Sequence, residues 1–193
     1  MNWCVLLCLV AACSRPHEES DTYRREQISF DKERKPEKIV EALGIGPGSR
    51  VADIGASSGL MTVHLARAVA PNGRVVATDI DGQVLRLLVQ HVKAAGLSDV
   101  VEPRVVAANA PGLEVNSYDA ILLAEVDHLL DDPAAWLGAA TRALKPGGRV
   151  AISNRVYRHA KSIAATKKAG LVLVSESNPV PTHFIAVFTA GPS

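Results

Sequence analysis

The sequence predicts an α/β domain with a seven-stranded sheet, mostly parallel, whose last strand is antiparallel. Apolar segments of strand length alternate with amphipathic helical segments from about residue 30 onward. The last two apolar segments, 171–175 and 183–189, are separated by only about seven residues. A parallel crossover needs a dozen residues or more, so these two strands are expected to pair antiparallel.

Local sequence signals predict the bounds of the individual helices and strands. Segment 36–43 is an amphipathic helix closed by Gly44, and 50–54 is a short apolar strand that leads into a glycine-containing turn. Asp132 and Pro133 supply a helix cap followed by proline at the first helical position. The same reasoning predicts helices over 60–70, 81–95 and 132–144, and strands over 74–80, up to about 107, 119–124 and 149–153.

Composition limits the classes of function. The 193 residues suffice for one domain with a substantial core, and the net charge of +1 gives no support for a nucleic-acid partner. All three cysteines lie within the first 13 residues. A disulfide framework, a cysteine-ligated zinc and any mechanism that needs thiols in the domain are therefore excluded, and no metal site is predicted.

The first residues have the pattern of an export signal. Residues 3–12 form an apolar run of ten, too short to span a membrane, and small residues precede Cys13. Val10-Ala11-Ala12-Cys13 resembles the bacterial lipobox, which implies a signal peptide over 1–12, a lipidated Cys13 and a flexible tether over 13–29. The resemblance further implies the outer rather than the inner membrane, because Ser14 follows the cysteine. The alternatives are a misplaced start or a buried N-terminal strand, and a cytoplasmic protein if the signal does not function.

The strongest motif is the turn after the first predicted strand. Its glycines allow a tight turn that brings a ligand close to a helix N-terminus. A dinucleotide fold expects G-x-G-x-x-G, whereas this turn has Gly55, Ser57 and Leu60 at those positions. With Asp53 and Gly59 it resembles instead motif I of class I S-adenosylmethionine-dependent methyltransferases. In that family the loop holds the amino-acid end of the cofactor, and the acid acts directly or through water. The alternative is an ordinary strand-to-helix turn.

Two further strand ends supply cofactor-binding candidates. Asp79 ends the second strand, where a carboxylate can accept hydrogen bonds from both ribose hydroxyls, and Ile80 would pack on the adenine. The alternative for Asp79 is a helix cap, a role that suits Asp81 better. After the third strand, Asn109 and Ala110 stand where the family has an acid that contacts the adenine amino group, and Asn109 offers a carbonyl for that bond.

The resemblance extends over about residues 30–189. Segments 118–123 and 143–150 are similar to the fourth strand and to the loop before the fifth strand of these methyltransferases. It implies a Rossmann-like, doubly wound domain over 30–193. Phe30-Asp31, Lys35-Pro36 and His128 resemble a group of exported bacterial proteins related to small-molecule methyltransferases. Segment 154–170 is shorter than the acceptor-covering segment of that group, which implies a reduced lid.

The chemistry expected is an in-line methyl transfer, for which alignment of donor and acceptor supplies much of the rate. Glu125, Asp127 and His128 follow the fourth strand, at the sheet edge where ligands bind. We predict His128 as the general base because histidine titrates near neutrality, and Glu125 over the cofactor or acceptor entrance. Alternatively, Asp127 caps or solvates the next helix and His128 is structural. No chemical role is predicted for His183.

Two functions follow from these residues. The first is a methyltransferase that uses S-adenosyl-L-methionine on a small acceptor. The second is a membrane-tethered binding protein that kept the fold and lost catalysis, favoured by Ser57, by Leu129 after His128 and by the short lid. Asp53, Asp79 and Asn109 favour the first. The expected partners are a small-molecule substrate and, through the lipid, a membrane.

Overall fold

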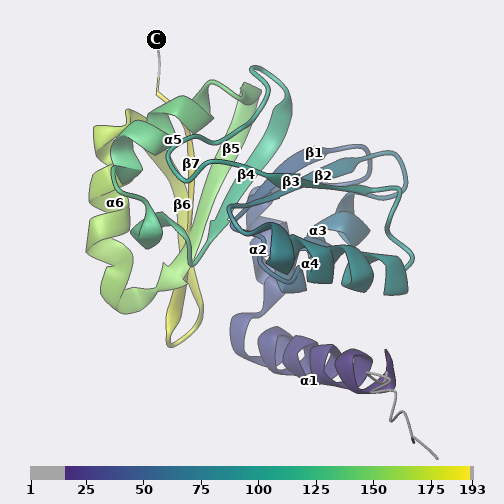
Figure 1. The fold of residues 1–193 in the computed structure, drawn as a ribbon. Coiled ribbons are helices and arrows are strands. Elements are labelled where there is room, and N and C mark those ends of the chain that lie inside the picture. Colours follow the sequence, from purple (N-terminus) through teal and green to yellow (C-terminus); the bar gives the residue numbers. More distant parts are fainter. Residues whose placement is uncertain (1–15, 192–193) are drawn as a thin grey trace, which may run out of the picture.

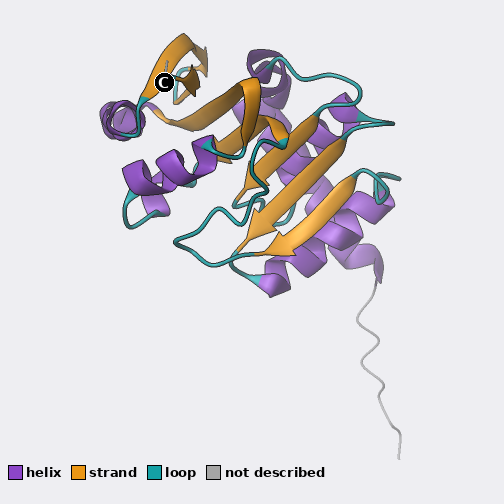
Figure 2. Ribbon diagram, turned by 90° about the horizontal axis from the view of Figure 1, so that it is seen from above, coloured by secondary structure: helices purple, strands orange, loops and turns teal. Residues whose placement is uncertain are grey.

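The computed structural model describes residues 16–191 of the chain. The predicted signal peptide and Cys13 lie outside this range. None of the helices it describes combines the length and the apolar character needed to cross a bilayer. One sheet runs through the molecule with helices on both of its faces (Figures 1 and 2).

The sheet has seven strands in the order β3-β2-β1-β4-β5-β7-β6. The first five strands pair in parallel, and β7 is antiparallel to both β5 and β6, which confirms the predicted fold class. The chain winds outward from β1 to β3 and then returns to β4 beside β1, so a crevice is expected at their carboxyl ends. The strands are β1 (Arg50–Ile54), β2 (Arg74–Asp79), β3 (Val101–Val105), β4 (Tyr118–Ala124), β5 (Leu144–Arg155), β6 (Leu171–Val180) and β7 (His183–Ala190).

Two apolar layers form because successive residues of a strand point to opposite faces of the sheet. Val51 packs with the helices on one face, and its neighbour Ala52 packs on the other. The first face carries α2 (Pro36–Leu43), α3 (Leu60–Val69) and α4 (Gly82–Ala94). The second carries α5 (Pro133–Thr141) and α6 (His159–Lys168), seen on the left in Figure 1.

The predicted end of the helix over 132–144 was too late. Helix α5 ends at Thr141, and β5 already begins at Leu144. Leu144 pairs with Tyr118, while Ala120 pairs with Arg149, so residues 145–148 bulge out of the ladder. The Lys-Pro-Gly-Gly segment therefore interrupts a strand instead of separating a helix from one.

Residues 16–29, predicted as a flexible tether, are helical in the structure. Helix α1 (Pro16–Arg34) covers them and continues through residue 30, where the domain was expected to begin. Side-chain bonds four residues apart support the helix, from the Tyr23 hydroxyl to Gln27 at 2.9 Å and from Gln27 to Asp31 at 2.7 Å. The segment lacks an apolar stripe, and helical periodicity could not reveal it.

Polar and aromatic contacts dock α1 on the domain. The Tyr23 ring stacks on His91 of α4 with centroids 3.3 Å apart, and Gln27 Nε2 donates to the Leu60 carbonyl at 3.2 Å. Asp31 Oδ1 lies 2.8 Å from His64 Nε2. These contacts hold α1 below the sheet in Figure 1, against α3.

Candidate functional site

A cavity of about 430 Å³ opens at the carboxyl ends of β1, β2, β3 and β4, and we call it the main cleft. Six of the predicted cofactor residues line it: Gly55, Ser57, Asp79, Ile80, Ala110 and Glu125. Asp53, Gly59, Asn109 and His128 are not among its lining residues. Its other apolar walls are formed by Ile54, Val106, Ala107, Ala108, Ala124, Val126, Leu129, Leu130 and Trp136.

The turn from β1 to α3 depends on close backbone approach. Gly55 has φ of 66°, and a Cβ there would lie 2.1 Å from Cγ2 of Val126. Ser57 adopts a left-handed conformation with φ of 51°, and its N–H donates to Asp79 Oδ2 at 2.9 Å. The carboxylate of Asp79 thus ties the β1 turn to the end of β2. Its other oxygen accepts from the N–H of Asp81 at 3.0 Å.

Asp81 caps α4, as the sequence predicted. Its Oδ1 accepts from the Gln83 N–H at 2.7 Å. Asp79 therefore remains at the cleft wall, while the capping role belongs to its neighbour. Next to it, Ile80 presents 64 % of its surface. An exposed apolar side chain in a cleft is suited to cover the face of a planar ring.

Asp53 lies beneath the turn and not in the main cleft. Its side chain is 1 % exposed and accepts from Thr62 Oγ1 at 2.6 Å. Burial, helped by the charge of Asp79 and opposed by the Thr62 hydrogen bond, raises the pKa of Asp53 to about 7. This geometry positions Asp53 to support the turn from below.

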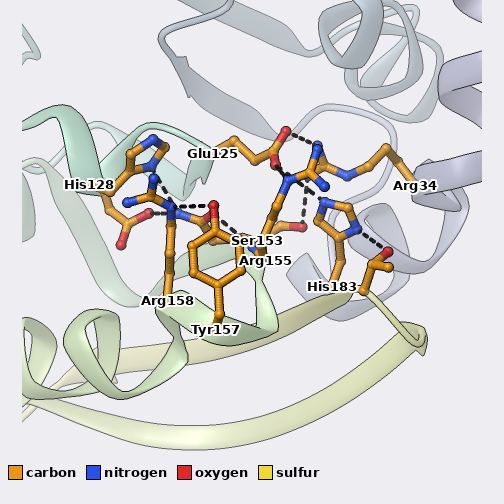
Figure 3. A network of polar contacts seen from close by, with 11 residues as sticks. Arg34, Glu125, His128, Ser153, Arg155, Tyr157, Arg158 and His183 are labelled. Atoms are coloured by element: carbon orange, nitrogen blue, oxygen red, sulfur yellow. Dashed lines mark hydrogen bonds and ion pairs between the residues drawn. The ribbon is translucent and has the colours of Figure 1, made fainter.

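Glu125 holds a cluster of basic side chains at the end of β4. Arg34 Nη1 contacts its Oε2 at 2.5 Å, while Arg155 Nε at 3.1 Å and His183 Nε2 at 3.3 Å share its Oε1 (Figure 3). Partial burial opposes ionisation, but Arg34, His183 and Arg155 outweigh it and lower the pKa of Glu125. Glu125 is therefore ionised at neutral pH and is a poor proton acceptor.

Arg34 and His183 form the buried side of this cluster. Arg34 is 8 % exposed, and its Nη2 donates to Ser153 Oγ at 3.3 Å. His183 is 4 % exposed, and its Nδ1 lies 2.9 Å from the Thr182 hydroxyl. Burial and the charge of Arg34 lower the pKa of His183, so it donates to Glu125 as a neutral ring.

A second hollow, of about 620 Å³, meets the main cleft at Glu125, and we call it the α1 cavity. It lies between α1 and the ends of β5, β6 and β7. Its lining residues are Glu26, Ser29, Phe30, Lys32, Glu33, Arg34, Leu60, Glu125, Arg155, Val180, Thr182 and His183.

His128 belongs to a separate network on the α6 side. Asn154 donates from Nδ2 to Asp127 Oδ1 at 2.6 Å and lies 3.1 Å from His128 Nδ1, while its Oδ1 accepts from the Arg155 N–H at 2.7 Å. These two partners fix the orientation of the amide, so His128 Nδ1 is the acceptor. A neutral His128 then carries its proton on Nε2, which suits a hydrogen-bond donor better than the predicted base.

Comparisons with known proteins agree with this architecture. Residues 52–150, slightly more than half of the chain, match the family described as a methyltransferase domain. The chain belongs to this methyltransferase family. The superfamily resemblance read from the sequence is thus confirmed, whereas the resemblance to exported lipoproteins stays a prediction.

Two relatives of this methyltransferase domain are named as enzymes of quinone biosynthesis. The ubiquinone/menaquinone biosynthesis C-methyltransferase of Teredinibacter turnerae is 32 % identical over 113 residues, which cover 58 % of this chain and 45 % of that protein. The ubiquinone biosynthesis O-methyltransferase of Ralstonia nicotianae is 31 % identical over 144 residues, 73 % of this chain and 57 % of that protein. The chain thus spans about half the length of these curated relatives.

A solved methyltransferase has the same fold. The SAM-dependent methyltransferase from Aquifex aeolicus superposes with a TM-score of 0.79 at 23 % identity, covering 88 % of this chain and 97 % of that one. At this identity the likeness concerns the fold alone.

The sequence identified the main cleft of this methyltransferase domain but missed the basic side chains around Glu125. Arg155 and His183 are direct partners in the antiparallel pairing of β5 and β7. The sequence predicted the antiparallel pairing of the last two strands but not this one, which places the first residue of β7 beside the carboxyl end of β5. No local signal therefore marked the place of His183 beside Arg155, and Arg34 depended on the docking of α1.

Proposed function

We propose that this protein is a methyltransferase that uses S-adenosyl-L-methionine to methylate a small acceptor. The observation that carries the proposal is the main cleft, where a strained turn and the carboxylate of Asp79 meet beside the exposed Ile80. Its volume of about 430 Å³ lies within the usual range for small-molecule sites.

The residues present fit this cofactor. Asp79 would accept the ribose hydroxyls, Ile80 would cover the adenine, and the turn of Gly55 and Ser57 would hold the amino-acid end. Gly59 and the buried Asp53 would support that turn. Asn109 and Ala110 belong to the segment after β3 that would border the adenine.

The chain's own groups then orient the reactants and set the charge around them. The cofactor supplies a methyl group on a positively charged sulfonium. Glu125 contributes an ionised carboxylate to the wall of the cleft, and Trp136, Leu129 and Leu130 contribute apolar surface that excludes water. His128 lines neither the main cleft nor the α1 cavity, so its role as the general base stays a prediction and no positioning role is assigned to it.

Calorimetric titration of the full chain with S-adenosylhomocysteine tests the proposal. Asp79→Ala should weaken binding at least about tenfold, because it removes a charged hydrogen-bond acceptor. Asp81→Ala is the matched control, since it loses a helix cap but leaves Asp79 in the cleft. NADH should not bind.

The outcome also separates catalysis from binding alone. If S-adenosylhomocysteine does not bind at about 1 mM, the methyltransferase proposal is wrong. If it binds but no methyl group is transferred to any member of a panel of phenols, amines and acids, the tethered, non-catalytic alternative becomes the better account.

We further propose that the protein is lipid-anchored in the bacterial cell envelope, at the outer membrane. The ten-residue apolar run and the lipobox-like segment before Cys13 support this address. Metabolic labelling with a clickable palmitate analogue tests it, with Cys13→Ala compared against Cys8→Ala. Label that survives Cys13→Ala would contradict the anchor.

A further inference from the structure

The α1 cavity is placed to hold the molecule that receives the methyl group. It shares Glu125 with the main cleft, so a ligand in the α1 cavity has one end beside the cleft. Its remaining walls come from α1, from Leu60 at the start of α3, and from β5, β6, β7 and the turn between the last two strands.

The floor of this cavity has more cationic than anionic groups. Arg34 and Arg155 both pair with the single carboxylate of Glu125, and His183 beside them is neutral. Arg34 Nε is buried and has no hydrogen-bond partner within residues 16–191. Arg155 uses only Nε in the described part of the chain, so both of its Nη groups are available for an acceptor.

Exposed side chains at the rim of the cavity carry one net negative charge, which balances the excess positive charge of the floor. Glu26, Lys32 and Glu33 of α1 are exposed, and Glu33 also accepts from the Ser29 hydroxyl at 2.9 Å. Exposed charges are screened by salt over about 8–10 Å, and this applies to the rim and to Arg155, whose side chain is 51 % exposed, whereas the buried Arg34 is screened less. Arg34 therefore contributes the less screened part of the positive charge that a bound molecule experiences.

Apolar side chains complete the cavity. Phe30, Leu60 and Val180 line it next to the charged floor. A ligand that fits both features has an apolar body with one acidic group. A guanidinium with two free Nη donors matches a carboxylate, which accepts two parallel hydrogen bonds.

We propose that the α1 cavity is the acceptor site and that it selects a small carboxylate-bearing molecule, whose carboxylate binds the Nη groups of Arg155. The apolar body then lies against Phe30 and Leu60, toward Glu125 and the main cleft. The role of the bound molecule as methyl acceptor rests on the proposed methyl transfer, whereas the carboxylate-binding site does not depend on it.

The proposal is tested on the full chain by measuring the binding of four small acids. They are acetate, succinate, benzoate and phenylacetate, and the affinity of each is compared with that of the corresponding amide. At about 10 mM ligand, at least one acid should bind measurably while its amide does not. Arg155→Gln should weaken that acid about tenfold or more, and Arg155→Lys should weaken it less. Arg158→Gln is the matched control, because Arg158 lies nearby and contacts Tyr157 but does not line the cavity.

S-adenosylhomocysteine binding, measured on the same samples, keeps the two proposals distinguishable. Arg155→Gln should retain it within about twofold, which also shows that the variant is folded. If the cofactor product binds but no acid is preferred over its amide, or if Arg155→Gln and Arg158→Gln behave alike, the carboxylate site is wrong. If neither the original chain nor any of the variants binds S-adenosylhomocysteine while acid binding is intact, the proposed function is contradicted instead.

Discussion

The two cavities that meet at Glu125 are built in different ways. The main cleft is made largely by turns after consecutive strands, and many of its lining residues are apolar or small. The α1 cavity depends on charged and polar side chains from α1, the residue after β4, β5 and β7, which lie far apart in the sequence. The first construction leaves a motif in the sequence, and the second does not.

Two carboxyl groups show the same contrast. Asp53 beneath the main cleft is buried and accepts a hydrogen bond from one hydroxyl, and its pKa is raised to about 7. Glu125 has two arginines and a histidine, which together lower its pKa. The main cleft thus depends on close backbone packing, and the α1 cavity on charge pairing. Substitutions in each region should therefore fail for different reasons.

Glu125→Gln should give the largest effect. It leaves the guanidinium of Arg34, which is 8 % exposed, without its carboxylate partner. Breaking a buried pair in this way costs about 3–5 kcal/mol, and the partial exposure of Glu125 reduces the expected loss to about 3 kcal/mol. Urea denaturation measures it.

The double variant Arg34→Met/Glu125→Gln supplies the control. It removes both charges, so it should be more stable than Glu125→Gln alone. Additive losses would show that charge pairing does not stabilise the α1 cavity, and the contrast between the regions would fail.

Gly55→Ala tests the backbone packing of the main cleft. The new Cβ would lie 2.1 Å from Val126 Cγ2, at a φ of 66° that disfavours a side chain. We expect a loss of about 2–3 kcal/mol and weaker binding of S-adenosylhomocysteine. Thermal denaturation and calorimetry measure the two effects.

Gly96→Ala is matched to it in backbone strain, since Gly96 has a φ of 71° and a Cβ there would meet no other atom within 4 Å. It should cost only the strain, about 1 kcal/mol, and leave ligand binding unchanged. Adding Val126→Ala to Gly55→Ala should recover part of the loss. Equal losses for the two glycines would exclude the clash as the cause.

Much of the fold could be predicted because its signals are local. Asp53, Gly55 and Asp79 stand at strand ends that the apolar pattern marks, and the short connection between the last two strands fixed their direction. Helix α1 was missed because Tyr23, Gln27 and Asp31 dock it through stacking and hydrogen bonds. Such contacts depend on partners that are distant in the sequence, and no periodicity reports them.

Stability should depend on pH through Asp53. Its folded-state pKa of about 7 exceeds the unfolded value near 3.9, so the folded state holds the proton more tightly. This contribution is fully present below about pH 4 and is lost as the pH rises through about 7. Asp53→Asn should remove that slope and gain about 2 kcal/mol relative to the original chain between pH 5 and pH 8.

The exposed Asp99 supplies a control, because Asp99→Asn changes a surface carboxylate. Denaturation of both variants at the two pH values measures the difference. If Asp53→Asn leaves the dependence of the unfolding free energy on pH unchanged, Asp53 is ionised throughout this pH range. The turn at the main cleft then contains a buried negative charge.

Tyr23→Ala should have the smallest effect, and it distinguishes the two cavities by local stability. The Tyr23 ring stacks on His91 at 3.3 Å, and an aromatic contact of this kind contributes about 1 kcal/mol. Ile28→Ala is the control on the same helix, since Ile28 is 61 % exposed. Hydrogen exchange of the backbone amides in 21–30 should accelerate in Tyr23→Ala but not in Ile28→Ala. Because α1 is a wall of the α1 cavity alone, acid binding should weaken while S-adenosylhomocysteine binding does not change. If both ligands weaken together, α1 supports the main cleft as well, and the two cavities form one cooperative unit.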